Sequence, residues 1–240
     1  MISGNKVRRA SLTLHNWMGL FVGLQIILWF AGGLVMTVIP LDLVRGERSM
    51  AAQTAVSQPA LELSNIVGAI NLDAIRSVTA RQVADVPVFE VVDDNGDSRI
   101  YDAATAALLS PIDEALATKV AQADFSYRDS AQQEHGVLIT EWITEEPGDF
   151  RRKLPVWRVT FDDPDGTRLY VSPDTGRVMA RRNDYWRVFD FFWMLHIMDY
   201  ENRENFNNPL LIITTLTATL FVITGVVLLY FRFRPRRKRS

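Results

Sequence analysis

Residues 12–23 read LTLHNWMGLFVG and open the first long apolar stretch of the chain, which contains no charged residue from 10 to 41. A bilayer core about 30 Å thick takes about 20 residues of helix at 1.5 Å per residue, so this stretch is long enough to cross once. The apolar core of a cleaved signal peptide is shorter, about 7–15 residues, and a small-residue cleavage site follows it. We therefore expect a membrane anchor.

A second apolar stretch, residues 206–231, lies near the C-terminus, and the flanking charges predict the orientation of both. Basic residues precede the first stretch (Lys6, Arg8, Arg9) and follow the second (Arg232, Arg234, Arg236, Arg237, Lys238, Arg239). All 28 acidic residues lie between these two groups, with the other 17 of the 26 basic ones, so the middle carries a net charge of −11. Because basic loops stay in the cytoplasm, we expect a bacterial inner-membrane protein with both termini cytoplasmic and its middle periplasmic.

The expected fold is a membrane protein in which two transmembrane α-helices flank an α+β periplasmic domain. The predicted segments are a cytoplasmic N-terminus (1–11), a transmembrane helix (12–40), a periplasmic domain (41–184), a short interfacial helix (185–200), a second transmembrane helix (207–231) and a basic cytoplasmic tail (232–240).

The middle region contains an internal repeat. Residues 87–109 read PVFEVVDDNGDSRIYDAATAALL and residues 155–179 read PVWRVTFDDPDGTRLYVSPDTGRVM. In both, apolar and polar residues alternate on either side of an acidic turn that contains glycine, a pattern typical of an antiparallel hairpin. Helical periodicity precedes each hairpin, at 61–75 and 113–125. We predict two helix–hairpin units, at about 60–110 and 113–180, around a shared core.

Two polar features of this region have ordinary explanations. The turn DDNGD, residues 93–97, resembles the start of a calcium loop, but it lacks the Asp-x-Asp-x-Asp-Gly spacing and the closing glutamate. Turn chemistry accounts for its residues. His135 falls in a polar loop, 126–136, where we expect a solvated side chain.

Three short motifs, taken in order, resemble one family. They are LHNWMGLFVG in the first span, LYVSPDTGRVMAR at the end of the translocated region, and WMLHIMDY shortly before the final span. Their order and spacing are similar to the PepSY-associated transmembrane family over nearly the whole chain. The resemblance implies PepSY-like units in the periplasmic domain. Longer members have four spans and two such modules, and some resemble haem-containing reductases of iron–siderophore complexes, so this chain looks like half of such a protein.

His15 opens the first span and leaves two interpretations. On a helix, His15, Gly19 and Gly23 share one face. Gly19-x-x-x-Gly23 is a pattern that lets two helices approach closely, and His15 would then be a polar residue at the cytoplasmic interface. Alternatively, His15 is an axial ligand of haem b, since imidazole is a common ligand of haem iron, and the glycines leave room for the macrocycle.

His196 lies in VFDFFWMLHIMDY, where residues 191–198 are apolar except for the histidine. This stretch is too short to span, so we expect a helix in the outer membrane interface. His196 is the second candidate haem ligand, and Asp199 is placed to orient it. The alternative is a histidine satisfied by a lipid headgroup, water or a neighbouring helix. Gln25, a polar residue inside the first span, is expected to bond a partner helix.

Distance separates the two histidines. From His15 to Ile39 is about 36 Å of helix at 1.5 Å per residue, so one iron cannot bind both side chains. A homodimer, or a larger membrane complex, would pair the histidines in two separate haem sites and restore the four spans of the longer relatives.

The sequence leaves two function classes open. The chain has no cysteine, which excludes disulfides, iron–sulfur clusters and covalent haem attachment. It has no catalytic triad, phosphate loop or dinucleotide motif, so no catalytic residue is predicted and electrons would come from a separate donor. The first hypothesis is a redox subunit that passes electrons through haem b, or a ferric reductase acting on a periplasmic ferric chelate. The second is a non-enzymatic accessory or assembly subunit of a transporter or respiratory complex. The basic tail is a topology anchor, and no nucleic-acid partner is expected.

Overall fold

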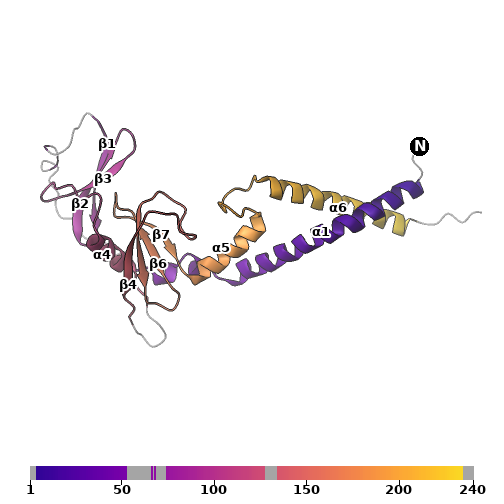
Figure 1. Ribbon diagram of the computed structural model, residues 1–240, viewed down its shortest axis with the longest axis horizontal. Helices are drawn as coiled ribbons and strands as arrows, with labels where there is room; N and C mark the ends of the chain where they lie inside the picture. The colour runs from indigo at the N-terminus through magenta and orange to yellow at the C-terminus, as the bar shows by residue number, and fades with distance from the viewer. Residues whose placement is uncertain (1–3, 53–65, 67, 69–73, 128–133, 235–240) are drawn as a thin grey trace, which may run out of the picture. The chain divides into compact units, whose positions relative to one another are not determined.

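The computed structural model describes residues 4–52, 66, 68, 74–127 and 134–234, and the chain divides into two compact units. Unit 1 comprises residues 1–40 and 188–240 and contains the long helices (Figure 1). Unit 2 comprises residues 41–187 and contains both β-sheets. Each unit is described by itself.

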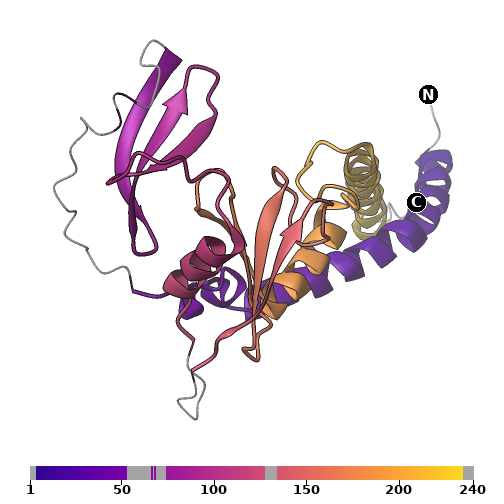
Figure 2. The same ribbon diagram turned by 60° about the vertical axis from the view of Figure 1, so that its left-hand side comes forward.

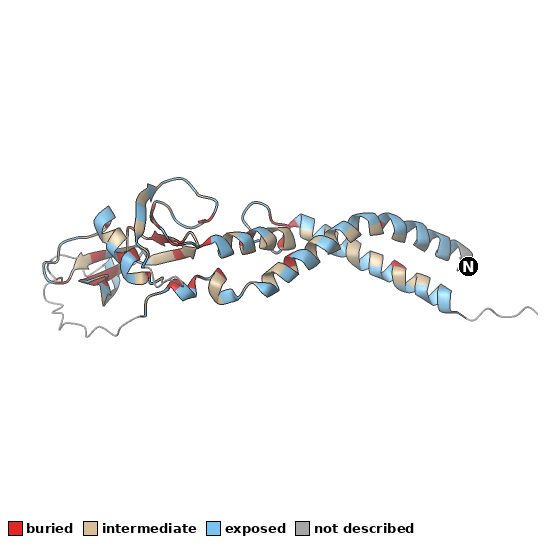
Figure 3. Cartoon of the chain, turned by 90° about the horizontal axis from the view of Figure 1, so that it is seen from below, coloured by how far each residue is buried: buried red, intermediate tan, exposed pale blue. Residues whose placement is uncertain are grey.

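Unit 1 is built on two helices, α1 (Gly4–Val38) and α6 (Pro209–Phe233). Both are long and apolar enough to cross a membrane. Their surfaces are mostly exposed (Figure 3), as expected for side chains that face lipid rather than a protein core. Asn208 caps α6 by accepting a hydrogen bond from the Leu211 N–H at 2.8 Å, and Pro209 occupies the first turn, where a proline is favoured.

Helix α5 (Asp184–Ile197) occupies the segment predicted as an interfacial helix, and its second half belongs to unit 1. This half packs along α1. The indole Nε1 of Trp29 donates to the His196 carbonyl at 3.0 Å, and a Cβ added at Gly32 would lie 3.5 Å from the Phe192 carbonyl oxygen. Small and aromatic residues of α1 therefore fix the position of α5.

Unit 2 contains a three-stranded sheet of β1 (Ile75–Val83), β2 (Val86–Asp93) and β3 (Ser98–Asp102), all antiparallel. A four-stranded antiparallel sheet follows, of β4 (Val137–Ile143), β5 (Val156–Phe161), β6 (Arg168–Val171) and β7 (Val178–Arg182). Helix α4 (Glu114–Asp124) lies between the sheets in sequence, and the short helices α2 (Leu41–Val44) and η1 (Glu47–Ser49) begin the unit (Figure 2).

Both predicted hairpins are present, as β2–β3 and β5–β6, and so is the helix predicted at 113–125. At the first turn, Asp93 Oδ1 accepts from the N–H groups of Asn95 and Asp97, which is the turn chemistry predicted for DDNGD. The description as helix then hairpin was incomplete, because β1 and β4 each add a strand before the hairpin. Most of the helix predicted at 61–75 lies outside the described residues, and the repeat relationship stays a prediction.

One core joins the two sheets. Alternate residues of β2 point to opposite faces, so Val88 packs in a cluster with α4 and the four-stranded sheet while Phe89 packs in a separate cluster. Glu90, 7% exposed, accepts hydrogen bonds at 2.6 Å from Arg81 Nε and Arg177 Nη2. Burial raises the pKa of Glu90, but the two guanidinium groups outweigh it and hold the pKa below its usual 4.5. The carboxylate therefore stays charged and links β1, β2 and the β6–β7 turn.

Candidate functional site

His15 is held by α6 of the same chain. Its Nδ1 lies 3.0 Å from Thr224 Oγ1 and 3.2 Å from the Phe221 carbonyl oxygen. The Thr224 hydroxyl donates its own proton to the Phe221 carbonyl at 2.8 Å. Both neighbours of Nδ1 are thus acceptors, which assigns the proton of a neutral imidazole to Nδ1 and leaves a lone pair on Nε2.

The ring of His15 fits into α6 by stacking. Its centroid lies 4.2 Å from that of Phe221, with 7° between the planes. A Cβ added at Gly225 would lie 3.3 Å from His15 Cε1, so glycine at this position makes space for the imidazole. Together Phe221, Thr224 and Gly225 form a seat for the His15 ring.

The two glycines that follow His15 differ in what they face. A Cβ at Gly19 would lie 3.1 Å from Phe221 Cε2, whereas a Cβ at Gly23 would meet nothing within 4 Å among the residues that the structure describes. The expectation that both glycines leave room for a macrocycle was wrong for Gly19, because the Phe221 ring fills that space. Gly23 alone of the two presents an open surface.

His196 lies near the end of α5, beside Trp29 of α1. The two ring centroids are 6.3 Å apart. Within the described part of the chain, the buried Nδ1 of His196 has no hydrogen-bond partner. A buried nitrogen without a partner carries a free-energy cost of about 1–3 kcal/mol, and such an atom is a candidate for contact with a ligand.

The expected role of Asp199 as the orienting partner of His196 was wrong. Its two carboxylate oxygens accept from the backbone N–H groups of residues 201, 202, 204 and 205, at 2.9–3.3 Å. These four bonds close the loop between α5 and α6. They also lower the pKa of Asp199, the Asn205 N–H most strongly, although partial burial opposes them.

The two histidines are well separated along α1. Fourteen residues lie from His15 to Trp29, about 21 Å at 1.5 Å per residue, and His196 is beside Trp29. This is shorter than the 36 Å span to Ile39 because α5 folds back along α1. Metal–imidazole bonds are about 2 Å, so one iron still cannot bind both side chains.

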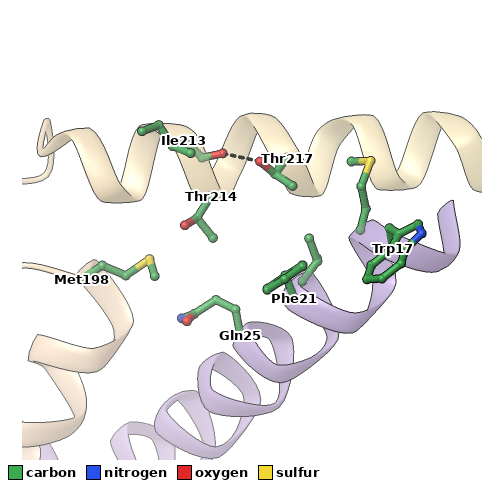
Figure 4. A pocket seen from close by; sticks show the side chains of 9 residues that line it. Trp17, Phe21, Gln25, Met198, Ile213, Thr214 and Thr217 are labelled. Atoms are coloured by element: carbon green, nitrogen blue, oxygen red, sulfur yellow. Dashed lines mark hydrogen bonds between the residues drawn. The ribbon is translucent and has the colours of Figure 1, made fainter. Parts of the chain in front are cut away.

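A cavity of about 510 Å³ lies between α1, α6 and the residue that follows α5 (Figure 4). Its lining includes Met18, Val22 and Gln25 from α1, Thr214 from α6, and Met198. Along α1 this cavity lies between the levels of the two histidines. Gln25 points into it, and the Gln25 Nε2 is buried with no hydrogen-bond partner among the described residues, so the expected bond to a partner helix stays a prediction.

His135, in unit 2, was expected to be a solvated side chain, and this prediction was wrong. The side chain is only 8% exposed, and its Nδ1 lies 3.1 Å from the Asp162 carbonyl oxygen while its ring meets Tyr127 edge-on. It belongs to the packing of unit 2. The described residues contain no group of three or more His, Cys, Asp or Glu side chains that could hold a metal ion.

Unit 2 carries a groove of about 710 Å³ along its edge strand β7. Val83, Val120 and Val178 supply apolar surface, and charged residues including Arg45, Glu47 and Arg177 line it as well. A mixed apolar and charged lining beside an open strand edge is suited to binding an extended peptide segment.

A family model described as PepSY-associated TM region matches residues 12–240. The chain belongs to the PepSY-associated TM family. No curated protein and no solved structure matches it. The family and the two long apolar helices together make the chain a membrane protein. His15, His196, Gly19 and Gly23 were predicted as site residues, whereas Phe221, Thr224 and Gly225 were missed, because only the crossing of α1 and α6 brings these three residues to His15.

Proposed function

We propose that this membrane protein is a redox subunit that holds haem b through His15 and His196 and passes electrons across the bacterial inner membrane. The observation that carries the proposal is the seat of His15, in which Nδ1 is anchored by Thr224 and the Phe221 carbonyl while Nε2 keeps a lone pair. Ligating histidines use the same arrangement, because a hydrogen bond on one ring nitrogen fixes the tautomer and orientation of the other.

His15 and His196 are chemically suited to hold haem b. At the second position, the buried His196 Nδ1 has no protein partner among the described residues, as expected of an imidazole that meets a ligand. A bound haem iron supplies one-electron transfer between its ferric and ferrous states. The protein's own contribution would be to orient two imidazoles about 21 Å apart along α1, so that each could hold a haem.

Further ligands come from outside the chain in this proposal. A homodimer, or a complex with a related subunit, would provide a second histidine at each level. Both termini are cytoplasmic and unit 2 is periplasmic, in keeping with the basic flanks and acidic middle. The electron donor is separate, and a periplasmic ferric chelate is the proposed acceptor.

The second candidate function is a non-enzymatic accessory or assembly subunit. The groove along β7 favours it, since a charged and apolar groove at a strand edge suits a protein partner. In this case the spans anchor unit 2 beside a transporter or respiratory complex, and neither histidine holds a cofactor.

Absorption spectroscopy of His15→Ala, His196→Ala and His135→Ala separates the two functions. With a redox subunit, dithionite-reduced protein extracted from membranes shows haem absorption bands. These decrease by about half or more in the first two variants and stay unchanged in His135→Ala, which alters a histidine of unit 2. Absence of a haem band in the parent protein, with normal membrane insertion, would exclude the redox function.

A further inference from the structure

We infer that the cavity between α1, α6 and Met198 binds the head ring of a neutral, lipid-soluble quinone. The inference rests on the proposed function, for which it names the class of electron donor. Quinone binding itself needs no haem. It is carried by the shape, exposure and hydrogen-bonding groups of the cavity (Figure 4).

The ligand enters from the bilayer. The floor of the cavity is buried, with Met18 and Met198 each 8% exposed, whereas Trp17 and Phe21 on its rim are 65% and 70% exposed. Because α1 and α6 are the membrane-spanning helices, this rim faces acyl chains. The space therefore opens sideways into lipid, and its volume of about 510 Å³ lies within the range for small-molecule sites, roughly 300–1,000 Å³.

The ligand carries a hydrogen-bond acceptor. Gln25 and Thr214 point into the same space from opposite helices (Figure 4). The Gln25 Nε2 is buried with no acceptor among the described residues, and the bilayer core offers no water to provide one. An acyl chain would fill the volume and leave this donor unsatisfied, whereas a carbonyl oxygen would satisfy it.

The ligand is neutral and flat. Of the described residues that line the cavity, none is charged, so a phospholipid phosphate would have no counter-ion. Away from Gln25, the lining presents the aromatic rings of Trp17 and Phe21 and the thioether of Met18, groups that pack against ring faces. A carbonyl-bearing ring with an apolar tail meets every one of these requirements.

The test measures quenching of tryptophan fluorescence by decylubiquinone in haem-free protein reconstituted in quinone-free nanodiscs. We expect saturable quenching that falls in Trp17→Phe. The Gln25→Leu variant should bind about fivefold more weakly, the size expected for one neutral hydrogen bond. Thr219→Val, which removes a hydroxyl from the exposed surface of α6 outside the cavity, should bind as the parent does.

Equal affinity of the parent and Gln25→Leu would overturn the inference, and so would non-saturable quenching. Equal competition by a quinone-free alkane would identify an acyl-chain groove instead and would also overturn it. A second variant, Thr217→Phe, fills the cavity while leaving the Gln25 side chain in place and should abolish binding. Quinone binding without a haem band would sustain this inference and defeat the redox function, and a haem band without quinone binding would do the reverse.

Discussion

The Nδ1 atom of His15 in α1 and the Oγ1 atom of Thr224 in α6 are 3.0 Å apart, although the two residues are separated by 209 positions in the sequence. The bond is local in space and fixes which nitrogen of His15 carries the proton. It also connects His15, the proposed haem ligand in α1, to the opposite span. Loss of the Thr224 hydroxyl should therefore change the orientation and tautomer of the His15 ring.

We expect Thr224→Val to weaken haem binding about tenfold, the lower end of the 10–100-fold loss typical when the partner of a metal-ligating histidine is removed. The lower end of the range applies because the Phe221 carbonyl oxygen, 3.2 Å from His15 Nδ1, still accepts a hydrogen bond from this nitrogen. Thr224→Ser keeps the hydroxyl and should retain haem, and Thr219→Val serves as the control in α6.

The same substitution has a readout without haem. In ¹⁵N-histidine spectra of haem-free protein, His15 of the parent should show a protonated Nδ1 and an unprotonated Nε2. Thr224→Val should broaden or shift this pair while His135 stays unchanged. A parent His15 with the opposite tautomer would contradict the assigned hydrogen bonds.

The membrane spans, their approximate bounds and the hairpins of unit 2 could be predicted, because hydropathy and period-2 alternation are local properties of the sequence. The strands β1 and β4 were missed because each precedes the Pro-Val pair at which the shared hairpin pattern begins. No feature of the sequence indicates that α5 packs on Trp29 and Gly32. The position of His196 along α1 is therefore known only from the structure.

Asp199 shows a different limit of sequence reasoning. Its spacing of three from His196 suggested a helical contact, but α5 ends at Ile197 and Asp199 turns to the backbone of the next loop. Thr224 was invisible for a related reason: hydroxyls in apolar spans commonly bond their own helix, and only the crossing of α1 and α6 brings this one to His15.

Glycine substitutions should separate helix contacts from open surface in unit 1. Gly19→Ala places a methyl 3.1 Å from Phe221 Cε2, so that ring must shift and the seat of His15 with it. Gly23→Ala adds the same methyl where nothing lies within 4 Å among the described residues. We expect Gly19→Ala to be less stable than Gly23→Ala by about 1 kcal/mol, the lower bound for overpacking, as measured by thermal unfolding in nanodiscs. Equal stability of the two variants would contradict the α1–α6 contact.

Alkaline pH should weaken unit 2 through one tyrosine. The Tyr170 hydroxyl donates to Asp149 Oδ1 at 2.5 Å, and burial with this carboxylate raises the pKa of Tyr170 to about 12. Its contribution to stability is complete below its ordinary pKa of 10.0 and is lost as pH rises toward 12. Phenolate absorbance of the folded protein should therefore include a late ionisation step from Tyr170, near pH 12. Tyr170→Phe should remove that late step, and joint ionisation of all six tyrosines near pH 10 would refute it.

The stability of unit 2 at acidic pH depends on the same pair, Tyr170 and Asp149. Burial raises the pKa of Asp149, but the Tyr170 hydroxyl and the charges of Arg168 and Arg187 outweigh it and hold the pKa below its usual 3.8. This stabilisation is complete above pH 3.8 and is lost as pH falls through the lowered pKa. We expect Asp149→Asn to be less stable than the parent at pH 7 and to lose less stability on acidification, as followed by tryptophan fluorescence.

Gly46 and Gly96 allow backbone strain to be separated from steric contact in unit 2. Both have positive φ, +65° and +87°, so an alanine at either position costs about 1–2 kcal/mol for its left-handed backbone. A Cβ at Gly46 would also collide with the Arg181 side chain, which is 8% exposed and paired with Asp124, whereas a Cβ at Gly96 meets nothing within 4 Å among the described residues. Gly46→Ala should therefore destabilise unit 2 by about 1–3 kcal/mol more than Gly96→Ala, the usual cost of overpacking. Urea unfolding of the two variants measures the difference, and a Gly96→Ala loss as large as that of Gly46→Ala would show that the Arg181 contact has no energetic weight.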